Sequence, residues 1–270
     1  MGRVEGKVAF ITGAARGQGR SHAVRLAEEG ADIIAVDFVE HIPNVTYPSA
    51  TPEDLAETVR LVEALDRRII ATKVDVRDRD ALKAAIDGGV AQFGKLDIVV
   101  ANAGICVIAG WDEVTPEIWD QTIGTNLTGY WHTAQLAAPH LIANGGGSII
   151  MTSSAAGIKG LPFLSPYVVS KHGVVGLMRA YATELAEYNI RVNTIHPTGV
   201  NTPMGSADGS KNFGALLEKH PKLGGTLVNL LPIEMTEPID QSNAVLFLAS
   251  DESRYVTSLE LTVDAGNTQY

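Results

Sequence analysis

Short apolar runs alternate with longer amphipathic segments along the whole chain. The runs are rich in Val and Ile and are apolar at consecutive positions, which is typical of strands covered on both faces. They occupy Lys7–Thr12, Ala31–Asp37, Arg68–Asp75, Leu96–Asn102, Ser148–Ser154, Ile190–His196 and Leu259–Asp264. The pattern therefore predicts a sheet of about seven buried strands.

The segments between these runs have helical spacing. RGQGRSHAVRLAEEG (16–30) and DRDALKAAIDGGVAQFG (78–94) place apolar residues three or four positions apart and close on glycine, which often ends a helix. Alternation of strand and helix implies parallel strands joined by crossover helices. Because no interior stretch has linker composition, we expect a single α/β domain spanning residues 1–270, a doubly wound parallel sheet with helices on both faces.

Two connections are longer than is usual between a strand and a helix. The first, at about residues 38–52, contains several prolines and leads to a helix with Thr51 as its N-cap and Pro52 in its first turn. The second, residues 199–237, is apolar and rich in glycine, and we expect it to form a loop over the substrate. Both connections contain more apolar residues than is typical of disordered segments.

Composition narrows the classes of function. The net charge of −10 and the lack of a basic patch exclude binding driven by nucleic-acid phosphates. The single cysteine, Cys106, cannot form a disulfide framework, and the N-terminus has no secretion signal, so we expect a cytoplasmic protein. No apolar run is long enough to span a membrane.

The histidines and tryptophans do not indicate a further site. The seven histidines show no metal-binding spacing, so no metal is expected. Trp111, Trp119 and Trp131 are expected in the core or at an interface.

The first strand leads into the glycine-rich sequence TGAARGQG (12–19), followed by a helix. In the Rossmann fold such a turn lets a pyrophosphate approach the free N–H groups of the helix. The spacing is GxxxGxG rather than GxGxxG, so a turn that merely closes the corner is the alternative. Asp37 ends the second strand, where a carboxylate accepts hydrogen bonds from the adenosine ribose and repels the extra phosphate of NADP. We therefore predict NAD as the cofactor.

Tyr167 and Lys171 lie one helical turn apart in SPYVVSKHG (165–173), on the same face of a predicted helix. A phenol has an ordinary pKa near 10, which is too high for proton transfer at neutral pH. A nearby cation would lower that pKa and make the tyrosine a usable acid or base. By itself the spacing is also compatible with a packed tyrosine beside a solvated lysine.

Seven motifs occur in the order typical of one family: TGAARGQG, DVRD (75–78), ANAG (101–104), NLTG (126–129), SS (153–154), YVVSK (167–171) and HPTGVNTPM (196–204). Together they resemble the classical short-chain dehydrogenases/reductases over essentially all 270 residues. The long connection after Asp37, the TPEDL sequence (51–55) and the extra residue Thr198 are most similar to the carveol dehydrogenase branch. Members of that branch are often associated with the redox peptide mycofactocin.

The resemblance implies a catalytic tetrad. In it Tyr167 is the general acid or base, Lys171 tunes the tyrosine and holds the nicotinamide ribose, and Ser154 binds the substrate oxygen. Asn126 would hold a water molecule that relays protons from Lys171. Ser153 and Ser154 could instead only satisfy backbone groups at a strand end, and Asn126 could be a buried structural amide.

The resemblance also implies the cofactor contacts. The pyrophosphate turn would use Gly13, Arg16, Gln18 and Gly19, and the adenosine half would meet Asp37, Phe38, Asp75 and Val76. The nicotinamide half would meet Asn102, Ala103, Gly104, Tyr167, Lys171, Val200 and Thr202.

We therefore expect an NAD-dependent oxidoreductase acting on a hydrophobic secondary alcohol or ketone, such as a cyclic terpenoid alcohol. The mostly apolar residues expected to face the substrate are Ile105, Cys106, Val107, Ile158, Leu161 and Phe163. The resemblance implies a homotetramer whose subunits contact each other through the helices from Thr115 and Tyr167 and through the last strand. It also implies that NAD is held tightly and that mycofactocin is the electron carrier. A catalytically silent NAD sensor or scaffold and an acyl-carrier ketoreductase are the alternatives, disfavoured by the intact tetrad and by Asp37 respectively.

Overall fold

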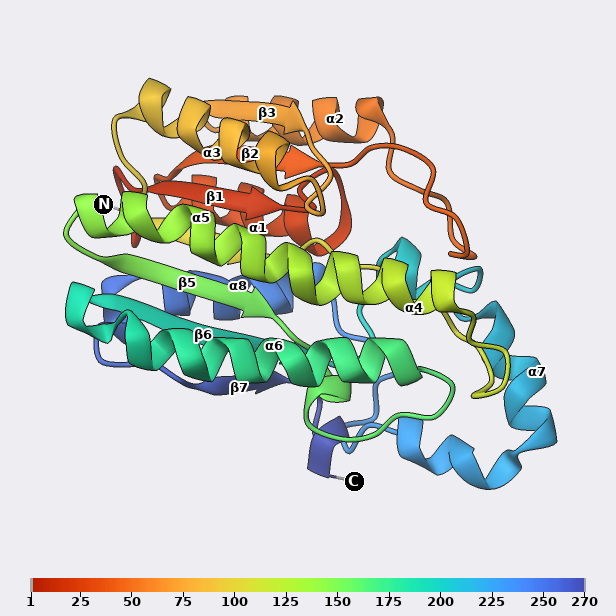
Figure 1. Ribbon diagram of the computed structural model, residues 1–270. Helices are drawn as coiled ribbons and strands as arrows, with labels where there is room; N and C mark the ends of the chain where they lie inside the picture. The colour runs from red at the N-terminus through yellow and green to blue at the C-terminus, as the bar shows by residue number, and fades with distance from the viewer. Residues whose placement is uncertain (1, 270) are drawn as a thin grey trace.

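The computed structural model describes residues 2–269 and is built around one parallel sheet of seven strands (Figure 1). The strands lie in the order β3-β2-β1-β4-β5-β6-β7. Their bounds are β1 Val8–Thr12, β2 Asp32–Asp37, β3 Ile69–Lys73, β4 Ile98–Ala101, β5 Gly147–Thr152, β6 Ile190–Pro197 and β7 Glu260–Val263. The strand order reverses between β1 and β4, and a crevice for a ligand forms at such a switch point.

All seven predicted strands and the doubly wound α/β fold are confirmed. The observed strands differ from the predicted runs by at most two residues at either end, the usual ambiguity of element boundaries. Every residue of β1 and β4 is buried, which explains why these strands are apolar throughout rather than alternating.

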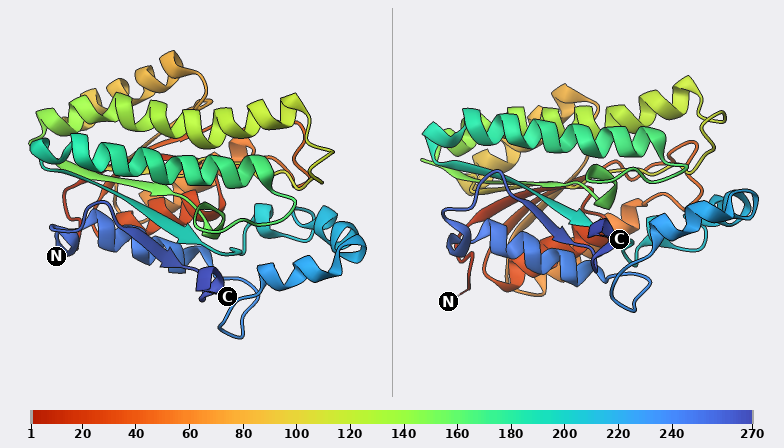
Figure 2. Two further views of the ribbon diagram at one scale, coloured as in Figure 1. Left: turned by 60° about the horizontal axis from the view of Figure 1, so that its bottom comes forward. Right: turned by 90° about the horizontal axis from the view of Figure 1, so that it is seen from below.

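Helices cover both faces of the sheet (Figure 2). One face carries α3 (Arg79–Phe93), α5 (Gly129–Ala143) and α6 (Ser165–Glu184), and the other carries α1 (Gly17–Glu28), α2 (Pro52–Glu63) and α8 (Pro238–Ala249). The short α4 (Pro116–Ile123) precedes α5. No helix within residues 2–269 combines the length and apolarity needed to cross a bilayer.

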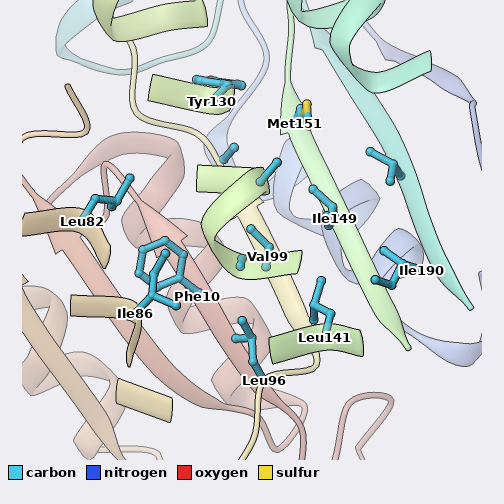
Figure 3. Close-up of a cluster of buried hydrophobic side chains, with 14 of the residues drawn as sticks. Phe10, Leu82, Ile86, Leu96, Val99, Tyr130, Leu141, Ile149, Met151 and Ile190 are labelled. Carbon is cyan, nitrogen blue, oxygen red and sulfur yellow. The ribbon is translucent and has the colours of Figure 1, made fainter. Parts of the chain in front are cut away.

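Each face of the sheet contributes its own hydrophobic core. On the α3–α5–α6 face, Phe10, Val99 and Ile149 from three adjacent strands pack against Leu82 of α3 and Leu141 of α5 (Figure 3). Burying an aliphatic or aromatic side chain of this size contributes about 2 kcal/mol to the stability of the fold. The two cores fix the strand ends that carry the site.

The helix predicted after the first long connection is confirmed. It begins at Pro52 with Thr51 as its N-cap. The Thr51 hydroxyl accepts from the Asp54 N–H at 3.2 Å, and the Asp54 carboxylate accepts from the Thr51 N–H at 3.0 Å. This reciprocal pair satisfies two N–H groups that the first helical turn would otherwise leave free.

Two predictions need correction. The segment 199–237 was expected to be a loop, but it contains the helix α7 (Lys211–Lys219). None of the nine residues of α7 is fully buried, although Phe213, Leu216 and Leu217 are half-buried at helical spacing. The helix is short and has Gly214 in its interior, which weakens its signal in the sequence. Trp111, Trp119 and Trp131 lie outside the core, with 87%, 40% and 39% of their surfaces exposed, so the expectation of a core position is wrong, whereas an interface position stays a prediction.

Candidate functional site

A groove and a cavity adjoin each other at the carboxyl ends of the strands. The groove, of about 170 Å³, passes the ends of β1, β2 and β4, and the cavity, of about 320 Å³, lies beside β5 and β6. They share the lining residues Gln18, Asn102, Gly104, Thr202 and Met204, so the two spaces are continuous. A long ligand in the groove can therefore present one end to a second molecule in the cavity.

The glycine turn after β1 forms a cradle at one wall of the groove. Gly13 has a φ of +68°, and a Cβ atom there would lie 2.8 Å from the Cα of Ala103. A Cβ on Gly19 would overlap the carbonyl oxygen of Gly13, so α1 can approach the strand end only with glycine at this position. The first turn of α1 has no acidic side chain and no side-chain cap, which leaves its N–H groups free for an anion.

Gln18 lies where the groove meets the cavity. Its side-chain Oε1 is buried and has no hydrogen-bond partner among the residues that the structure describes. A buried polar atom of this kind is normally satisfied, so it points to a ligand group in the groove. The cradle and this atom together fit a dinucleotide.

Asp37 ends β2 at the groove wall. Its Oδ2 accepts from the Ala15 N–H at 2.9 Å, and its Oδ1 accepts from the Val39 N–H at 3.2 Å. Burial raises the pKa of this carboxyl above its ordinary value, and the backbone donors oppose that increase. The backbone donors fix the carboxylate facing the groove.

Beyond Asp37 the groove is lined by Phe38, Asp75 and Val76. Arg77 lies with its guanidinium 5.9 Å from the centre of the Phe38 ring and donates to the Asp75 carboxylate at 2.9 Å. This hydrogen bond raises the pKa of Arg77. Arg77, the arginine in this part of the groove lining, therefore has a carboxylate partner inside the chain.

Asn102 follows β4 and holds the groove floor. Its Nδ2 donates to the Thr12 carbonyl oxygen at 3.1 Å, while the backbone N–H groups of Asn102 and Ala103 donate to the Thr12 hydroxyl at 2.9 Å and 3.0 Å. The Asn102 amide thus bridges the ends of the first and fourth strands.

Tyr167 and Lys171 lie one turn apart on α6 and both line the cavity. Lys171 Nζ donates to the Thr152 carbonyl at 2.7 Å and to the Tyr130 hydroxyl at 3.3 Å, and it lies 5.5 Å from the centre of the Tyr167 ring. Only 3% of the Lys171 surface is exposed. The lysine is therefore a buried amine beside the phenol rather than a solvated surface residue.

The pKa of Tyr167 does not shift in the direction expected from a neighbouring cation. Burial lowers the pKa of Lys171 to about 7. Burial also raises the pKa of Tyr167, an effect that a hydrogen bond with Ser154 opposes. In the protein alone the cost of burying charge exceeds the attraction between the two groups, because a low-dielectric site disfavours both the ammonium and the phenolate.

The two serines after β5 have different environments. Ser153 is buried and its hydroxyl donates to the Lys171 carbonyl oxygen at 3.0 Å. Both serines line the cavity, but Ser154 is the less buried; its Oγ accepts from the Ala156 N–H at 3.1 Å and lies 3.5 Å from the Pro197 carbonyl oxygen. Ser154 is therefore the serine whose hydroxyl reaches the ligand space.

Asn126 lies in a π-helical turn, η1 (Gly124–Thr128), between α4 and α5. Its side chain is fully buried, and it accepts from the Ile105 N–H and donates to the Ile105 carbonyl, each at 2.8 Å. Nδ2 also lies 3.3 Å from the Ser170 hydroxyl. Such π turns often mark functional positions, and this one fixes the backbone after β4 against α6.

We call residues 38–51, the connection after β2, the strap. Its Tyr47 is 7% exposed, and the Tyr47 hydroxyl accepts from the Cys106 N–H at 3.2 Å. Tyr47 and Ile42 line the groove. The strap therefore closes over the groove instead of extending into solvent.

Three further hydrogen bonds hold the strap at separate points of the rim. They join Arg16 to the Pro48 carbonyl, Asn44 to Gln121 at 3.1 Å, and Thr46 to the Gly209 carbonyl at 3.4 Å. These partners belong to the glycine turn, to α4 and to the late segment 199–237. The strap consequently links three elements around one ligand space.

The cavity is mostly apolar. Ile108, Leu164, Met204, Phe213 and Met235 contribute to its wall. Of the six residues that were expected to face the substrate, Cys106 and Leu161 line the cavity and Ile105 lines the groove. Val107, Ile158 and Phe163 lie outside both linings, and 37% of the Ile158 surface is exposed. Burial raises the pKa of the Cys106 thiol to about 12, so it is a neutral apolar group there.

The structure brings nearly all of the predicted site residues together. The predicted cofactor positions all line the groove or the cavity, as do Ser154, Tyr167 and Lys171, whereas Asn126 lies behind the lining. Sequence reasoning missed Tyr47 as a groove residue, and it missed Tyr130 and His196 near the site. Tyr130 directly follows the NLTG motif and His196 begins HPTGVNTPM, so their positions could have indicated them, whereas no motif includes Tyr47.

Comparison with known proteins places this geometry among characterised folds. Residues 7–212 match the family model described as short chain dehydrogenase. A short chain dehydrogenase from Mycobacterium paratuberculosis, solved with NAD bound, is 54% identical, with a TM-score of 0.98 and full coverage of both chains. The carveol dehydrogenase of Mycobacterium avium, solved in complex with NAD, is 51% identical, with a TM-score of 0.92 and full coverage of both chains. The (-)-trans-carveol dehydrogenase of Rhodococcus erythropolis is 50% identical over 275 residues, covering 99% of each chain.

Proposed function

Because this chain belongs to the short chain dehydrogenase family, we propose that it oxidises a hydrophobic cyclic secondary alcohol of the carveol type, or reduces the corresponding ketone. The chain is an NAD-dependent oxidoreductase. NAD supplies the hydride acceptor for alcohol oxidation when it is bound. The observation that carries the proposal is the buried pair Tyr167–Lys171 on the wall of an apolar cavity that continues into the groove.

In this proposal the groove residues hold the cofactor in a fixed order. The glycine turn and the N-terminus of α1 bind the pyrophosphate, since their N–H groups are free. Asp37 accepts from the adenosine ribose, and Asn102 with Lys171 lies toward the nicotinamide end, where the groove meets the cavity. Val200 and Thr202 line the cavity at the same junction.

We assign proton transfer to Tyr167. Its hydroxyl takes the proton of the substrate alcohol, and Ser154 donates a hydrogen bond to the same substrate oxygen. Lys171 lies 5.5 Å from the centre of the Tyr167 ring, so a phenolate on Tyr167 and an ammonium on Lys171 would each favour the charged form of the other. Asn126 keeps the backbone of Ile105 in place and is proposed to hold a water molecule that relays protons from Lys171.

The proposed substrate class is tested with a panel of alcohols. Carveol and alkyl-substituted cyclohexanols should be oxidised with the highest kcat/KM, because the cavity wall offers dispersion contacts to apolar rings. Linear short alcohols of equal polarity should be about ten-fold poorer or worse. Equal activity on all of them, or activity only on charged substrates, would contradict the assignment.

Asp37 is expected to select NAD over NADP. The Asp37→Ala variant should reduce the ratio of kcat/KM for NAD to that for NADP by about ten-fold or more, because it removes repulsion of the 2′-phosphate. Glu40→Gln is the control, since Glu40 also lines the groove but is exposed and ion-paired with Lys73. A parent protein that already prefers NADP would show this interpretation to be wrong.

We further propose that NAD stays bound through turnover and is reoxidised in place by an external carrier, with mycofactocin as the candidate. The strap supports this proposal because it crosses the groove and is anchored on three elements. Its prolines restrict the unfolded strap, which lowers the entropy lost when it closes. A packing role against a neighbouring subunit is the alternative.

Loosening the strap should accelerate NAD release. Replacing residues 42–50 by a short turn, or Tyr47 by Ala, is expected to raise the dissociation rate of NAD about ten-fold or more, since a buried anchor controls the rate of dissociation. The matched control is His41→Ala, which changes an exposed strap residue that lies outside the groove lining and outside the three anchoring hydrogen bonds. Nucleotide retained on the purified protein is measured by dialysis and extraction. Parent protein that purifies without nucleotide and exchanges NAD freely would count against retention.

Assembly as a homotetramer is also proposed. Trp119, Trp131 and Val169 leave 39–45% of their surfaces exposed on α4, α5 and α6, the helices that the family resemblance assigns to subunit contacts. Exposed apolar side chains on adjacent helices are typical of interfaces. Light scattering that gives a monomer mass would reject this assembly.

A further inference from the structure

His196 lies directly behind the serine that faces the cavity. It is the penultimate residue of β6, its surface is completely buried, and its Nδ1 lies 2.9 Å from the carbonyl oxygen of Ser154. The same carbonyl oxygen accepts from the Gly157 N–H at 2.8 Å. Both lone pairs of this carbonyl are therefore bound, which fixes the peptide plane that follows Ser154.

The neighbours of the imidazole define its tautomer. A carbonyl oxygen can only accept, so Nδ1 must carry the proton. Nε2 lies 2.8 Å from the Thr194 hydroxyl, which is two residues earlier on the same strand. Burial lowers the pKa of His196, so the ring is neutral and Nε2 accepts from Thr194. Thr194 thus holds the ring in the form that donates to Ser154.

The end of β6 also contacts the side chain of Ser154. The Pro197 carbonyl oxygen lies 3.5 Å from Ser154 Oγ, and Pro197 lines the cavity whereas His196 lies outside its lining. The ring therefore touches the backbone of Ser154 and not the ligand space. His196 can therefore act on a ligand in the cavity only through Ser154.

We infer that His196 is a positioning residue that holds the Ser154 hydroxyl in the orientation required by the substrate oxygen. This inference rests on the proposed function, in which Ser154 donates to that oxygen. The Thr194–His196–Ser154 chain of hydrogen bonds joins β6 to the residue after β5, so it fixes the serine relative to the sheet. Misplacement of such a donor by about 1 Å can cost roughly a hundred-fold in rate.

The test compares His196→Leu, which removes the donor, with His196→Asn, which can place an amide N–H near the position of Nδ1. His196→Leu should lower kcat by about ten- to hundred-fold while the NAD dissociation constant stays within about two-fold. His196→Asn should restore kcat to within a few-fold of the parent. A merely structural role would not discriminate between these variants in kcat while sparing NAD binding.

A double-mutant cycle identifies the route of the effect. In a Ser154→Ala background the loss from His196→Leu should vanish, because the group that it positions is gone. Thr194→Val, which retains the imidazole ring, should lower kcat several-fold, and this effect should also vanish in the Ser154→Ala background. This variant replaces His196→Leu in the cycle if His196→Leu does not fold. Unchanged kcat in these variants, or a full loss that persists without Ser154, would overturn the inference.

A measurement that does not depend on enzyme activity tests this inference separately from the proposed function. Nitrogen NMR of labelled histidine should show His196 protonated at Nδ1 and unprotonated at Nε2 across neutral pH. The opposite tautomer, or a charged ring at neutral pH, would overturn the positioning role. An inactive parent with the expected tautomer would instead contradict the proposed function.

Discussion

Replacing Tyr167 by Phe is expected to lower kcat by about a thousand-fold, within the range for loss of a general acid or base. The change removes only the hydroxyl that accepts the substrate proton, and the ring continues to pack on the cavity wall. NAD binding should remain within a few-fold of the parent, since the groove is intact. Steady-state kinetics with carveol, together with nucleotide titration, measure the two effects separately.

Tyr130→Phe is the matched control for this prediction. The Tyr130 hydroxyl also lies near Lys171, at 3.3 Å, but it is buried and donates to the Thr152 carbonyl at 3.0 Å. Its loss should lower kcat only a few-fold, because no proton passes through it. If Tyr167→Phe turned over within a few-fold of the parent, another group would have to carry the proton.

Lys171→Met should impair both chemistry and cofactor binding. We expect kcat to fall by about a hundred-fold and NAD affinity by about ten-fold, because the ammonium both favours the phenolate and faces the nicotinamide end of the groove. Methionine has a similar length and tolerates burial, so the fold should be preserved. Thermal unfolding of the variant checks that point.

The pH dependence gives this variant a distinct signature. Alcohol oxidation requires the phenolate, so its rate rises with pH as Tyr167 loses its proton. Burial already raises the pKa of Tyr167. In the proposed mechanism the Lys171 ammonium favours the phenolate, so its removal should raise this pKa further. The rate profile of Lys171→Met should therefore move toward higher pH. A profile that is unchanged in position would show that Lys171 does not tune the tyrosine.

The sheet could be predicted from the sequence because burial on both faces leaves continuous apolar runs. Val8–Thr12 and Ile98–Ala101 are examples in which every side chain is enclosed. The helix α7 is harder to predict, although Phe213, Leu216 and Leu217 lie at helical spacing on its half-buried side. It has only nine residues, contains Gly214 and lies in a glycine-rich segment, so its pattern is too short to outweigh a loop.

The site also contains residues that a local motif predicts and residues whose role depends on contacts between distant segments. Residues such as Gly13, Asp37 and Lys171 were predicted because local motifs demand them. The π turn at Asn126 depends on two hydrogen bonds to Ile105, and the closure of the strap depends on Tyr47 reaching Cys106. Such contacts join segments distant in sequence, and no local pattern reports them. Burial by the surrounding segments likewise raises the pKa of Tyr167, whereas the motif alone predicts a lower value.

A single-turnover experiment tests the central claim most directly. Protein loaded with NAD is mixed with excess carveol in the absence of any external electron carrier, and the absorbance of the reduced nicotinamide is followed by stopped flow. We expect a rapid rise that reaches about one equivalent per chain in the parent and is about a thousand-fold slower in Tyr167→Phe. A parent that forms no reduced nicotinamide with carveol or any cyclic secondary alcohol, or a Tyr167→Phe variant with the parent's rate, would contradict the account.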